Sequence, residues 1–236
     1  MRKLFSFIAT ASLVTFSACK KTTEKFPTAP LSDYFPLAVG KYITYSLDSI
    51  VYYDNFGTSA STKSYQVKQV VDAQITDNLG RPGYRIIRYI RSTPTAAWVA
   101  DNTFMAINTG TTLEWVENNL RFMKLKEPIQ QDYTWKGNSY INTNSQTPYL
   151  KYYDDWDYYY DSLNMPAKIG TLTVDSTIKV SEIDDQTAID RTFSEAKYAK
   201  GIGLVYRNFL YWNKGNANGT YSDNSYGVIL KMIDHN

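Results

Sequence analysis

Apolar and polar residues alternate with a period of two along much of this chain after residue 40, and no long stretch follows the 3.6-residue period of a helix. Successive side chains of a strand point to opposite faces, so this pattern predicts strands with one buried face. Turn-forming residues separate these segments at short spacing, which favours antiparallel pairing. The sequence predicts an all-β fold built as an antiparallel sheet, barrel or half-barrel, with a sandwich as the alternative. The clearest alternation places Leu172, Val174, Ile178 and Val180 opposite Thr171, Thr173, Asp175 and Lys179.

Individual segments can be assigned from the same pattern. Residues 64–91 are expected to form a hairpin around the turn formers of 77–83. The first strand is expected from residue 43, with a bulge near Ser49 where the alternation changes phase. One short helix is compatible with the sequence around Gln186 to Lys197. Further strands are expected at 98–108, 113–125, 202–212 and 228–233, all within one β-rich domain of residues 34–236.

Composition supports a β-rich domain and excludes one class of partner. Apolar residues make up 43% of the chain, and 21 Tyr, 10 Phe and 5 Trp favour strands. The formal charge of +2 includes Arg2 and Lys3, so the chain after residue 18 is neutral. A neutral domain without a basic stripe is not expected to bind nucleic acid.

Residues 1–18 have the organisation of an export signal. Arg2 and Lys3 precede an apolar run from Leu4 to Phe16, which is shorter than the roughly 20 residues of a transmembrane helix. The following Phe16-Ser17-Ala18-Cys19 resembles a lipobox. The resemblance implies cleavage before Cys19, a diacylglycerol thioether on its sulfur and a third acyl chain on the new amino group. An ordinary cleaved signal followed by a chance cysteine is the alternative.

A lipidated Cys19 would anchor the chain in a bilayer, because two or more acyl chains give stable attachment. Residues 19–33, with Pro27 and Pro30 and almost no apolar pattern, are expected to form a flexible tether. Lys20 follows the cysteine in place of the Asp linked to retention in the inner membrane, which favours the outer membrane. The periplasmic and the surface face both remain open.

Three segments carry a resemblance to a protein family. Residues 34–42 (YFPLAVGKY), 135–138 (WKGN) and 198–206 (YAKGIGLVY) are similar to segments of uncharacterised outer-membrane lipoproteins of Bacteroidetes. The third segment is also similar to one in lipoprotein-carrier-like half-barrels, where a glycine pair lets the chain enter a strand. The resemblance implies a secreted β-lipoprotein and no particular activity, since fold analogy does not give function.

The most unusual segment is 152–161 (YYDDWDYYYD), with six aromatic and four acidic residues. On a strand, Tyr153, Asp155, Asp157, Tyr159 and Asp161 would share an acidic face. The opposite, mostly aromatic face (Tyr152, Asp154, Trp156, Tyr158 and Tyr160) would suit the core, which is the structural interpretation. The candidate ligand-binding residues are Tyr153, Asp155, Asp157 and Tyr159.

Three functional interpretations of this segment stand beside the structural one. Flat aromatic rings beside carboxylates suit sugar binding, and clustered carboxylates suit Ca²⁺, although the glycine and terminal Glu of an EF-hand loop are missing. Asp155 and Asp157 could supply the acid and the base of glycoside hydrolysis. A second acidic patch, formed by Glu182, Asp184, Asp185 and Asp190, is expected to be a solvated loop, with metal binding as its alternative.

Nucleophilic and zinc catalysis are disfavoured. His235 is the single histidine and stands one residue from the end, and Cys19 is the single cysteine. The sequence predicts no catalytic set, no metal site and no cofactor. Two functional hypotheses follow: a non-catalytic, membrane-anchored envelope lipoprotein that binds a glycan, a lipid or another envelope protein, and a carbohydrate-active hydrolase that uses carboxylates of residues 154–161.

Overall fold

The structure, a computed structural model, describes residues 28–52, 59–144, 148–214 and 219–236. The export signal, Cys19 and the start of the tether lie outside the described residues. Within them, no helix is both long and apolar enough to cross a bilayer. The elements in chain order are α1 (Leu31–Tyr34), β1 (Tyr42–Val51), β2 (Ser61–Thr76), β3 (Pro82–Arg91), β4 (Val99–Asn108), β5 (Thr112–Glu117), β6 (Leu120–Lys126), β7 (Thr134–Lys136), the 3-10 helix η1 (Pro148–Tyr153), β8 (Asp157–Ile169), β9 (Leu172–Gln186), β10 (Asp190–Ala199), β11 (Gly203–Asn213) and β12 (Tyr226–His235).

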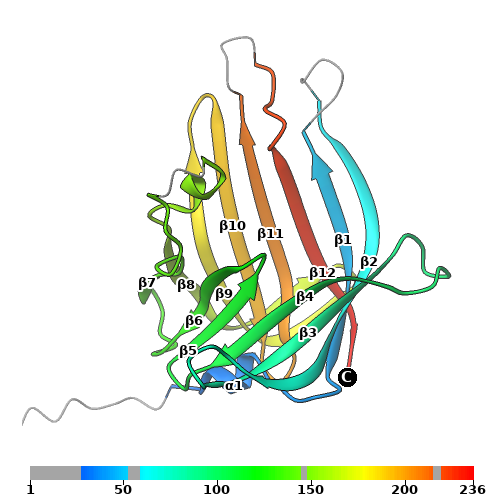
Figure 1. The fold of residues 1–236 in the computed structure, drawn as a ribbon, viewed down its shortest axis with the longest axis vertical. Helices are drawn as coiled ribbons and strands as arrows, with labels where there is room; N and C mark the ends of the chain where they lie inside the picture. The colour runs from blue at the N-terminus through cyan, green and yellow to red at the C-terminus, as the bar shows by residue number, and fades with distance from the viewer. Residues whose placement is uncertain (1–27, 53–58, 145–147, 215–218) are drawn as a thin grey trace, which may run out of the picture.

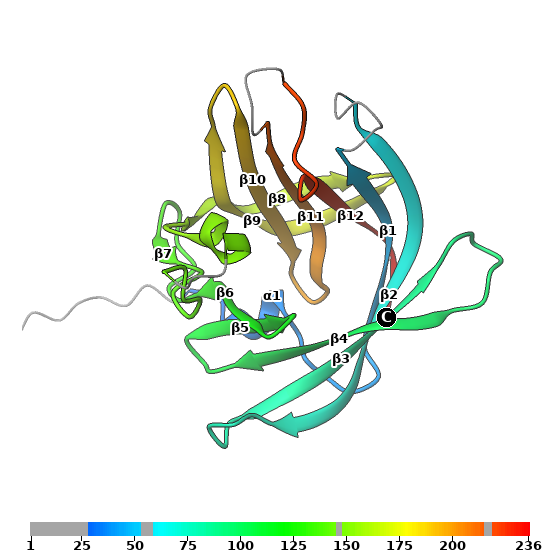
Figure 2. The same ribbon diagram turned by 45° about the horizontal axis from the view of Figure 1, so that its top comes forward.

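The described strands form one antiparallel sheet in the order β6-β5-β4-β3-β2-β1-β12-β11-β10-β9-β8-β7. The first and last strands of the chain pair at the centre of the sheet, and all other pairs join neighbours in sequence. The sheet curves strongly, so that β5 and β6 come round towards β9–β11 and the sheet is nearly closed into a barrel (Figures 1 and 2). This architecture confirms the all-β, antiparallel prediction.

The predicted hairpin of residues 64–91 is confirmed by β2 and β3. Its turn is organised by Asp77, whose carboxylate accepts hydrogen bonds from the backbone N–H groups of Leu79 and Arg81, both at 2.9 Å. The Arg81 side chain binds the same carboxylate. An aspartate that binds the backbone two residues on is a standard way to fix a turn. Hydrogen bonds within the turn therefore set the register of the hairpin.

The helix expected around Gln186 to Lys197 is wrong, because residues 172–186 and 190–199 are strands that pair with each other. The inward-facing residues of β10 include Thr192, Ser194 and Ala196, which are small or polar. The inward and outward residues of this strand therefore differ little in hydrophobicity, so the period-two pattern of a strand is not visible in its sequence. The bulge expected near Ser49 is also misplaced, since the register of β1 shifts between Thr44 and Tyr45 instead.

The short helix of this protein lies at the start of the domain. Leu31 to Asp33, which the sequence assigns to the end of the tether, belong to α1. Leu31 and Tyr34 are each only 1% exposed and pack in the main core cluster on the concave side of the sheet (Figure 2). The Tyr34 hydroxyl donates to Asn164 Oδ1 at 2.7 Å. The chain is thus held against the sheet from Leu31 onwards.

The two edge strands of the sheet, β6 and β7, come together on its open side. We term this contact the seam; it joins Met123 to Lys126 of β6 to Trp135, Gly137 and Tyr160. Trp135 Nε1–H donates to the Met123 carbonyl at 2.8 Å, and the Met123 N–H donates to the Gly137 carbonyl at 2.7 Å. A Cβ at residue 137 would overlap the buried ring of Tyr158, so only glycine fits there. Side chains and one backbone bond thereby replace a regular ladder at the seam.

Tyr160 satisfies both backbone groups of Lys126. Its hydroxyl donates to the Lys126 carbonyl at 2.8 Å and accepts from the Lys126 N–H at 3.1 Å. Its ring is fully buried against Trp135, at a centroid distance of 4.8 Å. One tyrosine thus caps an edge strand with the two hydrogen bonds that a neighbouring strand would supply.

We predict that Tyr160→Phe lowers the free energy of unfolding by about 1–3 kcal/mol, because it leaves a part-buried donor and acceptor without partners. The matched control is the adjacent Tyr159→Phe, whose ring is 36% exposed, and which should change stability by less than about 0.5 kcal/mol. Urea denaturation of both variants measures the difference. Equal stability of the two variants would show that the seam does not depend on this hydroxyl.

Candidate functional site

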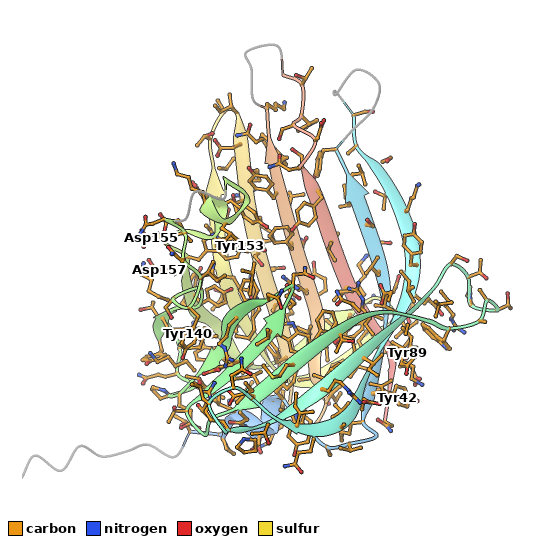
Figure 3. All side chains as sticks on the ribbon, viewed as in Figure 1. Tyr42, Tyr89, Tyr140, Tyr153, Asp155 and Asp157 are labelled. Atoms are coloured by element: carbon orange, nitrogen blue, oxygen red, sulfur yellow. The ribbon has the colours of Figure 1, made fainter. Side chains whose placement is uncertain are left out.

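The structure separates the four candidate residues of the aromatic and acidic segment. Tyr153 ends η1, Asp155 lies in a turn with φ of 59°, and only Asp157 and Tyr159 belong to strand β8. Figure 3 shows Asp155 and Asp157 on the outer side of the molecule, with Tyr153 further in towards the sheet. The prediction that all of them share one strand face is wrong, because the strand begins only at Asp157.

The two carboxylates share one cation. Lys136 Nζ lies 2.6 Å from Asp155 and 2.9 Å from Asp157, and the aspartate side chains are 83% and 62% exposed. These hydrogen bonds raise the pKa of Lys136. The structural interpretation of the opposite face is confirmed for three aromatic residues, since Trp156, directly before β8, and Tyr158 and Tyr160 within it are buried.

A cavity of about 210 Å³ lies on the concave side of the sheet. Tyr153 is the one candidate residue that lines it. Burial raises the pKa of this tyrosine to about 12, so its hydroxyl is neutral at physiological pH. The other aromatic lining residues include Phe35, Trp115, Tyr198, Phe209 and Tyr226, and the polar ones include Gln69, Arg88 and Asn102.

The floor of the cavity contains a buried ion pair between β6 and β9. Lys124 Nζ donates to both carboxylate oxygens of Glu182, at 2.9 and 3.1 Å, and Ser194 donates to Glu182 at 2.7 Å. Burial opposes ionisation of Glu182, but Lys124 and Arg207 outweigh it and hold its pKa below the usual range. Burial also lowers the pKa of Lys124, against the attraction of Glu182. The pair is charged and internally satisfied.

A second pair of charges, Arg207 and Glu117, lines the same cavity but is only loosely joined. Arg207 Nη1 lies 3.6 Å from Glu117 Oε1, beyond normal hydrogen-bond length. The other oxygen of Glu117 accepts a hydrogen bond from Trp115 Nε1 at 3.1 Å. Burial opposes the charge on Arg207, but the two glutamates outweigh it and raise its pKa. Arg207 is therefore a permanent cation at the cavity wall.

These charged residues are not among the site residues that the sequence predicts. The prediction of a solvated acidic loop is wrong for Glu182, since it is 1% exposed and lies within β9. A signal for the others was present. Lys124 has the same strand parity as buried Phe122, and Arg207 has the parity of buried Val205 and Phe209. A charged residue at an inward position of a strand marks a buried polar site.

In the part of the chain that the structure describes, no group of three or more His, Cys, Asp or Glu side chains is placed to hold a metal ion. The cavity can instead hold a small organic molecule between aromatic rings, with charged and amide groups to orient it. Fold and site together define a class: an all-β protein with a strongly curved antiparallel sheet and a partly charged internal cavity.

Comparisons with known proteins do not narrow this class further. No family model matches the chain, and no curated protein matches it either. Among solved structures, the chain matches a protein of Bacteroides fragilis described as a candidate exported protein with a YmcC-like fold. The identity is 10%, the match covers 85% of this chain and 99% of that one, and the TM-score is 0.35. A TM-score of this size supports no argument about function, and the resemblance to Bacteroidetes lipoproteins stays a prediction.

We predict that Glu182→Gln destabilises the protein by about 3–5 kcal/mol, because it removes the carboxylate that is hydrogen-bonded to the buried ammonium of Lys124. The double variant Lys124→Met/Glu182→Gln removes both charges and should recover a large part of that loss. Chemical denaturation of the single and double variants gives the coupling energy. Additive losses would mean that the two side chains do not act as a pair.

Proposed function

We propose that this protein is a lipid-anchored lipoprotein of the bacterial cell envelope that binds a small ligand in its concave cavity, without catalysing a reaction. The observation that carries the proposal is the cavity itself: about 210 Å³, lined by aromatic rings and by charged groups held inside the sheet. The export signal and the lipobox-like residues before Cys19 support the location. The outer membrane is the expected site of attachment, because Lys20 follows the cysteine.

The arrangement of the cavity supports binding. Its walls come from both halves of the curved sheet: Arg88 and Phe104 on β3 and β4, and Arg207 and Phe209 on β11. Aromatic side chains give a large contact area at low entropic cost, and the charged groups give orientation. The ion pair of Lys124 and Glu182 keeps the floor polar, so the cavity is not simply an apolar packing defect.

The hydrolase hypothesis receives no comparable support. Asp155 and Asp157 both bind Lys136 on the outer side of the molecule, and side chains at this degree of exposure have solvent on most sides. Asp154 and Asp155 line a shallow hollow of about 260 Å³, and Asp157 does not. The Asp154 carboxylate accepts a hydrogen bond from the Thr143 hydroxyl at 2.6 Å, and Asp155 binds Lys136. Hydrolysis of a glycoside by general acid–base catalysis needs one carboxyl on each side of the scissile bond. Asp155 and Asp157 instead converge on the same lysine.

The first test concerns the anchor. Cys19→Ala should move the protein from the membrane fraction to the soluble fraction, because no sulfur remains to carry the diacylglycerol group. Thr22→Ala, three residues further along, is the control and should leave the protein in the membrane fraction. Mass spectrometry of the mature N-terminus should find three acyl chains on Cys19. An unmodified cysteine, or an intact leader, would overturn the proposed location.

The second test concerns the cavity. Small molecules are extracted from the full protein purified in mild detergent from its own envelope and identified by mass spectrometry. Gln69→Trp, which places an indole in the cavity, should lose at least 90% of any compound that copurifies with the wild type. Gln74→Trp, at an exposed position of the same strand, is the matched control. A compound retained equally by both variants does not bind in the cavity, and an empty wild type would overturn the proposed function.

A further inference from the structure

Arg207 is the one arginine among the described residues whose side chain contains a buried nitrogen without a hydrogen-bond partner, namely Nε. Its side chain is 22% exposed, and its nearest carboxylate, on Glu117, lies 3.6 Å from Nη1. A guanidinium carries five N–H donors in a rigid plane. Leaving a buried donor unpaired is unfavourable, and native proteins contain few such groups. An unpaired guanidinium nitrogen at the wall of a cavity therefore needs an explanation.

The chain pairs another arginine completely. All three side-chain nitrogens of Arg81 bind carboxylate oxygens, with Nε and Nη2 on Asp77 and Nη1 and Nη2 on Glu114, at 2.8 to 3.1 Å. Arg88, which lines the same cavity as Arg207, binds both oxygens of Asp101, at 3.0 and 2.8 Å. Among the described residues, a buried guanidinium nitrogen without a hydrogen-bond partner is therefore specific to Arg207.

The neighbouring carboxylates form their hydrogen bonds with donors other than Arg207. Both oxygens of Glu182 bind Lys124, and one also accepts from Ser194. One oxygen of Glu117 accepts from Trp115. The two glutamates keep Arg207 charged through their fields without satisfying its N–H groups. The site thus contains a cation whose Nε has no hydrogen-bond partner and whose Nη1 lies beyond hydrogen-bond distance of Glu117.

The surroundings of Arg207 suit a flat molecule. The ring centroid of Phe209 lies 6.0 Å from its guanidinium carbon, and the rings of Phe209 and Tyr226 lie 5.1 Å apart. Tyr153 lines the same cavity. Planar carboxylates match the guanidinium fork with two parallel hydrogen bonds, and aromatic walls favour a ring that can stack.

We propose that Arg207 binds the carboxylate of a small organic acid whose six-membered ring packs against the aromatic side chains of the cavity. The inference rests on the proposed function and names the chemical class of its ligand. Two sources share this chemistry: sugar acids, in which the ring is a pyranose, and aromatic acids, in which it is a benzene ring. In both, the carboxylate would supply the acceptors that the guanidinium lacks, and the ring would exclude water from the pair.

Titration calorimetry of the full, lipidated protein in detergent tests this inference with four probes: galacturonate and benzoate, and their neutral counterparts galactose and benzyl alcohol. At least one acid should bind the wild type tenfold or more tightly than its neutral counterpart. The acid that binds more tightly identifies the source. Equal binding of each acid and its neutral counterpart, or no binding of either acid at millimolar concentration, would overturn the inference.

Two variants assign the effect to the guanidinium. Arg207→Gln should weaken binding of the preferred acid at least tenfold, whereas Arg85→Gln, at a β3 arginine that pairs with Asp72 and does not line the cavity, should change it less than threefold. Arg207→Lys keeps the charge without the planar fork and should bind with intermediate affinity. Equal losses for the Arg207 and Arg85 variants would contradict the assignment.

Two further readouts keep the test decisive. If Arg207→Gln does not fold, the thermal shift of the wild type decides the question, because an acid should raise the melting temperature and its neutral counterpart should not. The small molecules extracted with the wild type test the proposed function separately. A copurifying compound without a carboxylate would leave the cavity as a binding site while removing the role given to Arg207.

Discussion

The seam between β6 and the β7–β8 hairpin is the contact on which the rest of the architecture depends. A single antiparallel sheet with β6 and β7 at its edges would expose unpaired backbone groups on both sides. Here the Tyr160 hydroxyl and the Trp135 indole bind the backbone of β6, and the Gly137 carbonyl accepts a hydrogen bond from the Met123 N–H. Because its edges are joined in this way, the sheet keeps its curvature and encloses an interior.

The width of the interior enclosed by the sheet explains why a cavity is present. Eight strands form a barrel that side chains can fill, and larger numbers leave space that must hold something else. In this protein α1, with Leu31 and Tyr34, occupies part of the space, and the aromatic residues of β5, β8, β10 and β11 occupy more. The remainder is the cavity beside Lys124, Glu182 and Arg207. The curved sheet and the proposed binding site thus follow from the same number of strands.

Charges inside such a sheet are tolerated only when they are paired, and this protein contains two kinds of pairing. Lys124 and Glu182 satisfy each other at hydrogen-bond distance, which stabilises the floor. Arg207 and Glu117 remain further apart, and the buried Nε of the guanidinium has no hydrogen-bond partner. The first pair is structural, and the second gives the proposed site its preference for an anion.

The sequence by itself determined the strand class, the β2–β3 hairpin and the inward burial of Trp156, Tyr158 and Tyr160, because period-two alternation and turn chemistry act between near neighbours. The sequence did not reveal strand β10, because several of its inward positions are small or polar. It also did not reveal that Asp155 lies in a turn before β8 and not in the strand. Only the tertiary structure decided that Lys124, Glu182 and Arg207, from three separate strands, meet in one cavity. The physical reason is that their proximity depends on the curvature and pairing order of the whole sheet, which local sequence does not encode.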